Sequence, residues 1–420
     1  MLHDYLLWIS SKHVDELLMF LSALLVLDAP RYLLGKICAL LCDLIWPRPA
    51  HRDYCPTVCV ILAGYNESAN IANSAASLHG TYSKLQIIIV DDGSTDDSFQ
   101  HARQFARTHQ NVLALRRPNR GGKASATNWA MVYNRAEVTI IADADSTYAP
   151  DAVWEIIQPL KDPAVGGVSA PILVKNSFHN LLTWLQSYEY LHSIAIGRRA
   201  SELMNLLGIV SGAFGAFRTD VLRRIGVMDV GPPEDLDATL RLRRSGYRIA
   251  YAPHAYSYTD VPDTLRALTN QRIRWEQGGV VRNHCRKHLE MILPTSPNFR
   301  LSNLLLWLET VWFELISPFV ILGYFYWLFW TQPVEEVPYI LFWVLASYFL
   351  LEGLQAAICF YFTDDWKRDL LISLVFPLMA FYRTYLIFVR VYAVLTEILG
   401  YDSYHDNYVP QRVREATWKY

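Results

Sequence analysis

Residues 85–94 read LQIIIVDDGS. A run of Val and Ile without polar alternation, closed by aspartate and glycine, is typical of a strand that is buried on both faces of a parallel sheet. The runs TVCVILAG at 57–64 and EVTIIADADS at 137–146 have the same character. Because polar, helix-compatible stretches follow the runs at 57–64 and 85–94, the pattern is that of a parallel α/β sheet. We therefore predict an α/β domain from about Tyr54 to Asp260.

Polar side chains stand at the end of each predicted strand. They are Tyr65, Asn66 and Glu67 after the first strand, Asp91 and Asp92 after the second, and Asp143 and Asp145 after the third. In open sheets of this type ligands bind beyond the carboxyl ends of the strands, so we expect these side chains to share one rim. Asp and Gly are also common turn and helix-cap residues, and for DDGSTDD that interpretation stays open.

Asp143 and Asp145 are two carboxylates one residue apart at the end of a buried strand. Their mutual repulsion requires a cation to offset it, and a divalent ion that bridges to a diphosphate would do so. Lys123, in the run NRGGKAS, has the reach to contact a phosphate. That run lacks the first glycine of a P-loop and has Ala124 where Ser or Thr is required, which argues against a Walker-type NTPase. No GxGxxG follows a predicted strand, which argues against a dinucleotide site.

The composition points to a membrane protein. Of the 420 residues, 52% are apolar and 13% are aromatic, and the formal net charge is -2. A chain of this composition can fill the core of one or two domains and still contain enough apolar residues for several membrane passes. It has no overall positive charge that would attract nucleic acid. The six cysteines form no CxxC pair and no run with zinc spacing, so we expect free thiols in a reducing compartment.

The strongly hydrophobic segments lie near the two ends of the chain. Leu304–Trp330 and Val337–Phe362 are each long enough to cross a bilayer, which takes about 20 apolar residues. One further pass is predicted around Val14–Leu34, as an anchor that is retained because the start of the chain lacks the features of a cleaved signal peptide. Leu370–Leu399 carries Arg383 and Arg390, so it spans the membrane, tilts in it or lies partly in the interface.

Lysine and arginine next to these segments predict the orientation. They flank the first segment and precede the second, at Arg31, Lys36, Arg48, Arg52, Arg282, Arg286 and Lys287. Because positive residues stay inside, the middle of the chain is expected in the cytoplasm of a multi-pass protein of the inner (plasma) membrane. The loop TQPVEEV, without Lys or Arg, is expected outside, and TDDWKRD inside. A full crossing after Leu370 would leave a basic tail outside, against the same rule.

The predicted organisation has five parts. They are an N-terminal membrane anchor at 1–50, a cytoplasmic domain at 51–280, an interfacial segment at 281–303, a transmembrane region at 304–400 and a tail at 401–420.

Two further segments carry side chains suited to a sugar-nucleotide reaction. GPPEDLD, at 231–237, puts Glu234 and Asp235 at the start of a predicted helix, where the helix dipole alone would also favour them. A glycosyl transfer that inverts the anomeric centre needs a base, and Asp235 is a candidate. QRIRWEQGG, at 271–279, combines arginines that can fork onto a phosphate with a tryptophan that offers a flat apolar face.

The order of the segments AGYNES, VDDGS, NRGGKA, DADS, SGAFGAFR, PPEDLD and QRIRWEQGG resembles the family-2 processive glycosyltransferases. These include the bacterial cellulose, hyaluronan and poly-β-1,6-N-acetylglucosamine synthases. The resemblance covers about Tyr54 to Gly279, and SGAFGAFR and QRIRWEQGG look closest to the poly-N-acetylglucosamine synthases. It implies a GT-A-type (Rossmann-like) α/β domain with flanking transmembrane and interfacial helices.

The resemblance also implies roles for individual residues. Tyr65, Glu67, Asp91 and Asp92 would hold the uracil and ribose of a UDP-sugar, Lys123 and Arg274 would face its diphosphate, and Asp143 and Asp145 would hold Mg²⁺ or Mn²⁺. Asp235, beside Glu234, would be the general base, and Gln271, Arg274 and Trp275 would close over the donor, with Trp275 beneath the terminal sugar of a polysaccharide acceptor. The lipid bilayer and a small accessory membrane subunit are the further partners implied.

One departure leaves the sugar open. The poly-N-acetylglucosamine enzymes commonly show Gly-Asn-Pro-Arg where this chain reads VSAPILVKNS, at 168–177, without that Asn or Arg. N-acetylglucosamine is the expected donor sugar, and cellulose, hyaluronan and chitin oligomers are alternative products. A non-processive family-2 enzyme that adds one sugar to a lipid or oligosaccharide, and an inactive subunit that serves as a membrane pore or scaffold, are the competing hypotheses.

Overall fold

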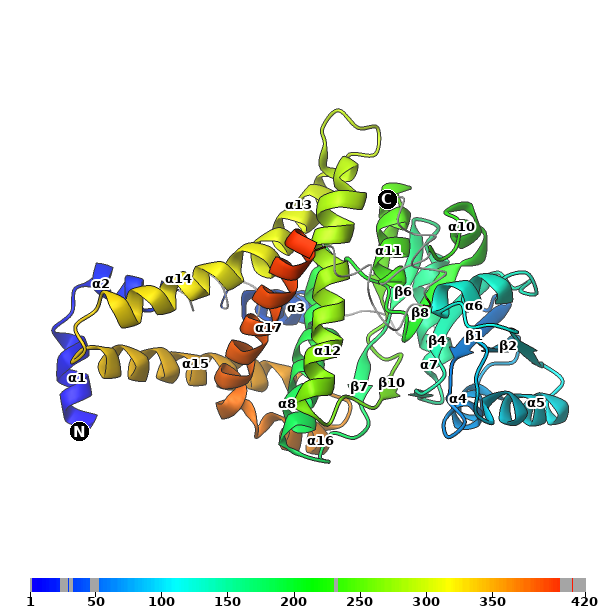
Figure 1. Ribbon diagram of the computed structural model, residues 1–420, viewed down its shortest axis with the longest axis horizontal. Coiled ribbons are helices and arrows are strands. Elements are labelled where there is room, and N and C mark those ends of the chain that lie inside the picture. Colours follow the sequence, from blue (N-terminus) through cyan, green and yellow to red (C-terminus); the bar gives the residue numbers. More distant parts are fainter. Residues whose placement is uncertain are drawn as a thin grey trace.

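A seven-stranded mixed sheet forms the centre of the domain in a computed structural model that describes residues 2–22, 29, 33–45, 53–229, 233–400 and 410 (Figure 1). Its strands, in the order β3-β2-β1-β4-β8-β6-β9, are β3 Val112–Arg116, β2 Leu85–Asp91, β1 Val58–Gly64, β4 Val138–Asp143, β8 Phe214–Arg218, β6 Val165–Ser169 and β9 Arg248–Tyr251. The strands β3, β2, β1 and β4 are parallel, and β8 runs antiparallel to both of its neighbours. The three predicted strands are β1, β2 and β4.

Both faces of this sheet are covered, which explains why its strands are apolar at successive positions. Leu62 and Ile87 point into one core, and Ile61 and Ile88 point into the other. The helices of the domain are α4 Ile71–Leu78, α5 Ser98–Thr108, α6 Lys123–Ala130, α7 Ala152–Ile157, η2 Gln158–Lys161, α10 Thr219–Arg224 and α11 Glu234–Arg244. A second sheet, in the order β5-β10-β7, joins β5 Thr147–Tyr148, β10 Ser257–Thr259 and β7 Ile172–Val174.

The strand register brings the predicted rim together. Gly64 at the end of β1 lies opposite Asp91 of β2, and Ala63 lies opposite Asp143 of β4. The three strands therefore end at one edge of the sheet, and the polar residues that follow them start from the same level.

Between the sheet and the long apolar helices near the C-terminus lies a layer of helices. Its members are α8 Leu181–Glu189, η3 Tyr190–Gly197, α9 Arg198–Leu203, α12 Leu265–Glu276, η4 Gln277–Lys287 and η5 Leu289–Ile292. η3 and η4 are π-helices that continue α8 and α12. In Figure 1 α8 and α12 stand between the sheet and the helices that extend away from it.

Three helices of the described chain are long and apolar enough to cross a membrane: Leu301–Trp330, Val337–Cys359 and Trp366–Gly400. The first comprises α13 Leu301–Thr310, η6 Val311–Ile316 and α14 Ser317–Trp330, the second is α15 Val337–Cys359, and the third comprises α16 Trp366–Ser373, η7 Phe376–Leu378 and α17 Met379–Gly400. The first two correspond to the predicted spans Leu304–Trp330 and Val337–Phe362.

The N-terminal helices contact opposite ends of α15. Lys12 lies between α1 Leu2–Ser10 and α2 Val14–Phe20. Its ammonium binds Glu336 at 2.9 Å, at the end of α15 nearest the α14–α15 turn. At the other end, Lys36 of α3 Gly35–Ile45 donates to Gln355 at 2.7 Å. Gln355 comes nineteen positions after Glu336, which is about 29 Å along a helix at 1.5 Å per residue. This agrees with the predicted pass at Val14–Leu34, but residues 23–28 and 30–32 lie outside the described part, and the pass stays a prediction.

The last helix, α17, lies beside α12 and runs across the direction of α14 and α15 (Figure 1). Its arginines have carboxylate partners, since Arg383 pairs with Glu352 of α15 and Arg390 pairs with Glu276 and Glu314. Of the three arrangements that the sequence left open, this direction favours an interfacial helix. The tail after residue 400 lies outside the described residues except for Pro410, so the side of the C-terminus, which the sequence left open, stays open.

Candidate active site

Gly212 is the point at which three predicted site residues meet. The Lys123 ammonium, at the start of α6, donates to the Asp143 carboxylate and, at 2.8 Å, to the Gly212 carbonyl oxygen. The Gly212 amide in turn donates to Asp235 Oδ2 at 2.9 Å. A side chain at this position would put its Cβ 3.3 Å from Lys123 Nζ and 3.4 Å from Asp235 Oδ2, so the glycine allows the close approach.

The segment that contains Gly212 also reaches β4, since the Asp143 amide donates to the Ala213 carbonyl at 3.1 Å. The sequence suggested SGAFGAFR as a motif but assigned it no role, because its contribution comes from backbone groups. The small residues Ser211, Gly212 and Ala213 before the apolar strand β8 were the sequence feature that could have indicated a close backbone approach here.

Several carboxylates gather at the end of β4. Burial, together with the charges of Asp143 and Glu67, raises the pKa of Asp145 to about 6. Burial also raises the pKa of Glu67. Gly64 at the end of β1 leaves room for this packing, because a Cβ there would lie 2.9 Å from the Cβ of Ala144 and 3.4 Å from the Cγ of Glu67. The site therefore concentrates negative charge, which a cation would relieve.

Lys123 is the cation that this part of the structure provides. Its burial disfavours the charged form, but Asp143 and Glu234 outweigh that cost and raise the Lys123 pKa above its usual value. Burial and the neighbouring Asp235 raise the pKa of Glu234. Asp235 lies in the first turn of α11, where its Oδ1 accepts the Leu236 amide at 2.8 Å.

Asp143 and Asp145 suit a divalent ion that is shared with a substrate. Among the residues that the structure describes, no three His, Cys, Asp or Glu side chains converge to hold a metal ion by themselves. Mg²⁺ typically uses one or two carboxylates and completes its shell with water and substrate phosphates. The two aspartates, in a cluster with raised carboxyl pKa, fit that mode of binding.

Asp91 and Asp92 fasten the end of β2 to the neighbouring loops. Asp91 is fully buried, accepts the Ser94 amide at 3.2 Å and lies 3.4 Å from Arg116 Nε. The Asp92 carboxylate accepts hydrogen bonds from the amides of Gly121 and Gly122, at 3.0 and 2.6 Å, and from the side chain of Arg117, at 2.9 Å. Asp92 thus holds the loop that leads directly into Lys123.

Tyr65 follows β1 and lies beneath Arg120. The Arg120 guanidinium is 4.1 Å from the centroid of the Tyr65 ring, which is the geometry of a cation–π contact. Arg120 belongs to the loop that Asp92 holds, so the ends of β1 and β2 are connected through it. No sequence pattern pointed to Arg120, because its contact with Tyr65 depends on how this loop folds back.

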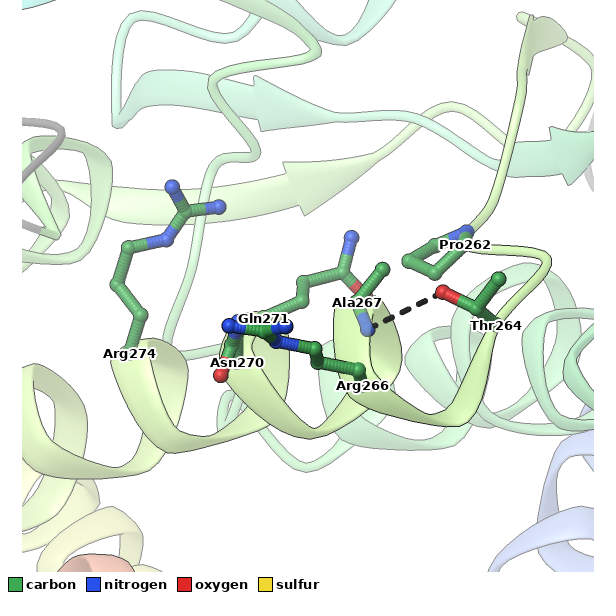
Figure 2. A pocket seen from close by; sticks show the side chains of 7 residues that line it. All are labelled: Pro262, Thr264, Arg266, Ala267, Asn270, Gln271 and Arg274. Atoms are coloured by element: carbon green, nitrogen blue, oxygen red, sulfur yellow. Dashed lines mark hydrogen bonds between the residues drawn. The ribbon is translucent and has the colours of Figure 1, made fainter.

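Gln271 and Arg274 lie on α12 and line a pocket of about 320 Å³ (Figure 2). The other lining residues are Pro262, Thr264, Arg266, Ala267 and Asn270. Thr264 caps the helix, because its hydroxyl accepts the Ala267 amide at 3.4 Å. Gln271 Oε1 is buried and has no hydrogen-bond partner. Arg266 and Arg274 give the pocket the positive charge of an anion site, and the unpartnered Gln271 Oε1 adds a hydrogen-bond acceptor. None of the acidic residues around Gly212 lines the pocket.

Trp275 is 39% exposed, which is unusual for a tryptophan held by a core. The Arg272 guanidinium lies 4.7 Å from its ring centroid, and Arg272 binds both oxygens of Glu189, at 2.8 and 2.7 Å. Tyr382 of α17 donates to the same carboxylate at 2.7 Å. These contacts fix the back of the indole and leave part of it uncovered.

Gly279, the last residue of QRIRWEQGG, faces α11. A Cβ at Gly279 would lie 4.0 Å from Leu236 Cδ2, in the first turn of α11. The helix that carries Trp275 therefore continues, through η4, to the turn that carries Asp235.

Comparison with known proteins identifies the domain. Residues 59–226 match the family model described as Glycosyl transferase family 2. This chain carries a family-2 glycosyltransferase domain. Poly-β-1,6-N-acetyl-D-glucosamine synthases from Staphylococcus epidermidis and Staphylococcus aureus (strain COL) are each 32% identical to it over 222 residues, which are 52% of this chain and 53% of theirs. The chain thus spans about half the length of these curated relatives.

A solved structure shares the overall fold. It is a mannosyltransferase from Pyrobaculum calidifontis in complex with GDP-Man and Mn²⁺, with a TM-score of 0.56, 21% sequence identity and coverage of 90% of this chain and 99% of that chain. This likeness confirms the predicted GT-A-type (Rossmann-like) α/β fold of the domain.

Proposed function

We propose that this glycosyltransferase transfers N-acetylglucosamine from a UDP-sugar to a growing β-linked polysaccharide, with inversion and processively. The observation that carries the proposal is the cluster around Gly212, where a candidate base, a lysine and the acidic end of β4 meet. The similarity to poly-β-1,6-N-acetylglucosamine synthases supports the choice of sugar and product.

In this proposal Tyr65, Glu67, Asp91 and Asp92 form the nucleoside side of the site. Arg120, stacked on Tyr65, and Arg117, bound to Asp92, add positive charge to the same loop. For uridine to donate a hydrogen bond to Asp92, one of the hydrogen bonds that the carboxylate accepts from Gly121, Gly122 or Arg117 would have to break.

Asp143 and Asp145 would hold Mg²⁺ or Mn²⁺, and the neighbour solved with Mn²⁺ supports a divalent ion. Such an ion supplies charge neutralisation for the departing diphosphate. Lys123 lies close enough to Asp143 to share that task, and Arg274 would contribute from α12. Because Lys123 is held by the Gly212 carbonyl, its charge is in position before substrate binds.

Asp235 would act as the general base. It takes the proton of the acceptor hydroxyl while that oxygen forms a bond to the anomeric carbon and the bond from this carbon to the UDP oxygen breaks, so the electron pair leaves with UDP. The amides of Gly212 and Leu236 orient its two oxygens. Glu234 precedes Asp235 at the start of α11, and burial together with the Asp235 charge raises the pKa of Glu234.

Trp275 would support the terminal sugar of the acceptor, while Gln271 closes over the donor. Sugar rings have apolar faces, so an aromatic surface grips a polymer without demanding one register. The product would leave through the helices 301–330 and 337–359, with the family-2 domain on the cytoplasmic side of the plasma membrane, together with any small accessory membrane subunit.

Product analysis of an Asp235→Asn variant tests the proposal. The variant should bind UDP in the presence of Mn²⁺ as the wild type does, yet form no polymer from labelled UDP-N-acetylglucosamine. Asp220→Asn is the matched control, because Asp220 is exposed and pairs only with Arg224 of the same helix among the described contacts. Loss of UDP binding in Asp235→Asn would contradict the role as base.

The length and linkage of the wild-type product distinguish the remaining alternatives. Purified membranes are incubated with each of several labelled UDP-sugars, and the product is digested with linkage-specific glycosidases. A long product that only a β-1,6-N-acetylglucosaminidase degrades is expected. Transfer of a single sugar would replace the proposal with a non-processive enzyme, and a product from another UDP-sugar would change the donor.

A further inference from the structure

A second pocket, of about 350 Å³, lies where the N-terminal helix α3 meets the family-2 domain. Its walls come from α3, from α9, from Arg248 of β9 and from Phe362, which follows α15. It shares no residue with the candidate active site or with the pocket on α12.

Arg199 is the unusual member of this pocket. It is only 7% exposed, its Nε has no hydrogen-bond partner, and its guanidinium lies over the Phe362 ring at 4.8 Å from the centroid. Arg248, by contrast, binds Asp162 at 2.5 Å. A buried guanidinium donor without an acceptor is costly, so its persistence beside an open volume points to an anionic ligand.

The position of the pocket relates it to the bilayer. Lys36, one turn before Ala39 at the pocket wall, donates to Gln355, and α15 ends four residues later at Cys359. The pocket therefore lies at the level where α15 leaves the apolar region. Leu41, Leu44 and Leu203, on the helices that form the pocket, are 50%, 57% and 47% exposed. A polar interior with an apolar border suits a ligand that has a charged head and an apolar body.

We propose that this pocket binds the headgroup of a membrane phospholipid, with its phosphate against Arg199. Asp43 of α3, across the pocket from Arg199 of α9, adds a carboxylate to the lining, as does Glu202 of α9. Arg199 and these carboxylates match a headgroup that carries an amine as well as a phosphate, so the pocket selects phosphatidylethanolamine over phosphatidylglycerol. The bound lipid joins α3 to α9 and fixes the N-terminal segment on the family-2 domain.

Native mass spectrometry of the purified full-length protein measures this binding. The wild type should retain phosphatidylethanolamine, and Arg199→Gln should weaken its apparent affinity at least about tenfold, since a charge-assisted hydrogen bond is lost. Arg224→Gln, which removes an exposed arginine of α10, is the control and should bind as the wild type does. Asp43→Asn should erase the preference over phosphatidylglycerol. Equal retention by the wild type and Arg199→Gln, or displacement of the lipid by inorganic phosphate at equal concentration, would overturn the proposal.

A measurement on the wild type keeps the test independent of how the variants fold. Cys42 lines the pocket, whereas Cys55 is exposed on the family-2 domain. In nanodiscs that contain phosphatidylethanolamine, maleimide alkylation of Cys42 should be at least about tenfold slower than in nanodiscs of phosphatidylglycerol alone, while the rate at Cys55 stays the same. An unchanged rate at Cys42 would show that no headgroup occupies the pocket. Neither readout depends on glycosyl transfer.

Discussion

Arg390 joins the last helix of the chain to two other elements. Its guanidinium binds Glu276, at the end of α12, and Glu314, in η6, each at 2.7 Å. The three side chains are 24%, 14% and 18% exposed, so water screens the pairs only in part. Arg390→Leu would leave two poorly solvated carboxylates facing the place of the lost cation.

The expected cost follows from that burial. Removing one partner of a buried ion pair costs about 3 to 5 kcal/mol, and the residual exposure favours the lower end of this range. For domains of 150–250 residues, 1 kcal/mol shifts the melting temperature by about 2 to 4 °C, so a loss of about 6 to 12 °C is expected. Because Glu276 follows Trp275 directly, polymer formation should fall even below the melting temperature.

Thermal unfolding in detergent, followed by tryptophan fluorescence, measures the shift. Arg224→Leu is the control, because its ion pair with Asp220 is exposed and such pairs contribute about 1 kcal/mol or less. A triple variant, Arg390→Leu with Glu276→Gln and Glu314→Gln, should regain part of the lost stability, since it no longer buries unpaired charges. Arg390→Leu that melts with the wild type, or a triple variant that is less stable than the single one, would refute the reasoning.

Three other predictions address the site and its support. EDTA should abolish transfer, and Asp145→Asn should lower its rate by orders of magnitude in a labelled UDP-sugar assay; full activity in chelator would exclude the metal role. Trp275→Ala should fold and bind UDP but lose elongation, while Trp275→Phe keeps part of it; wild-type polymer yield from Trp275→Ala would place the acceptor platform elsewhere. Asp237 is buried, yet its hydrogen bond with His288 and the nearby cations lower its pKa below the usual value. A lowered carboxyl pKa stabilises the fold above the unfolded value of about 3.9, so Asp237→Asn should lower the melting temperature at pH 7, and its difference from wild type should shrink as the pH falls below about 4; a constant difference would contradict this.

The sequence by itself determined three strands of the seven-stranded sheet, because burial on both faces forces continuous apolar runs, but it did not predict the antiparallel strand β8 that makes the sheet mixed. Residues 58–64, 85–91 and 138–143 are strands for this reason, and the acidic residues after them gather because parallel neighbours end at one edge. The predicted spans Leu304–Trp330 and Val337–Phe362 could also be found from the sequence, since a bilayer requires a certain length and an apolar composition of the segment itself. In each case the constraint acts on consecutive residues.

The tertiary structure alone decided how these parts are connected. Gly212 acts through its amide and carbonyl groups, which every residue has, so nothing in its side chain marked it as the junction of Lys123 and Asp235. The arginines of α17 made the last segment ambiguous in the sequence, because their cost in an apolar helix depends on partners more than 30 residues away, such as Glu352. The effect of a charged side chain or a backbone group depends on the group that it contacts. That partner can be far away in the sequence, so only the folded structure shows which two groups are paired.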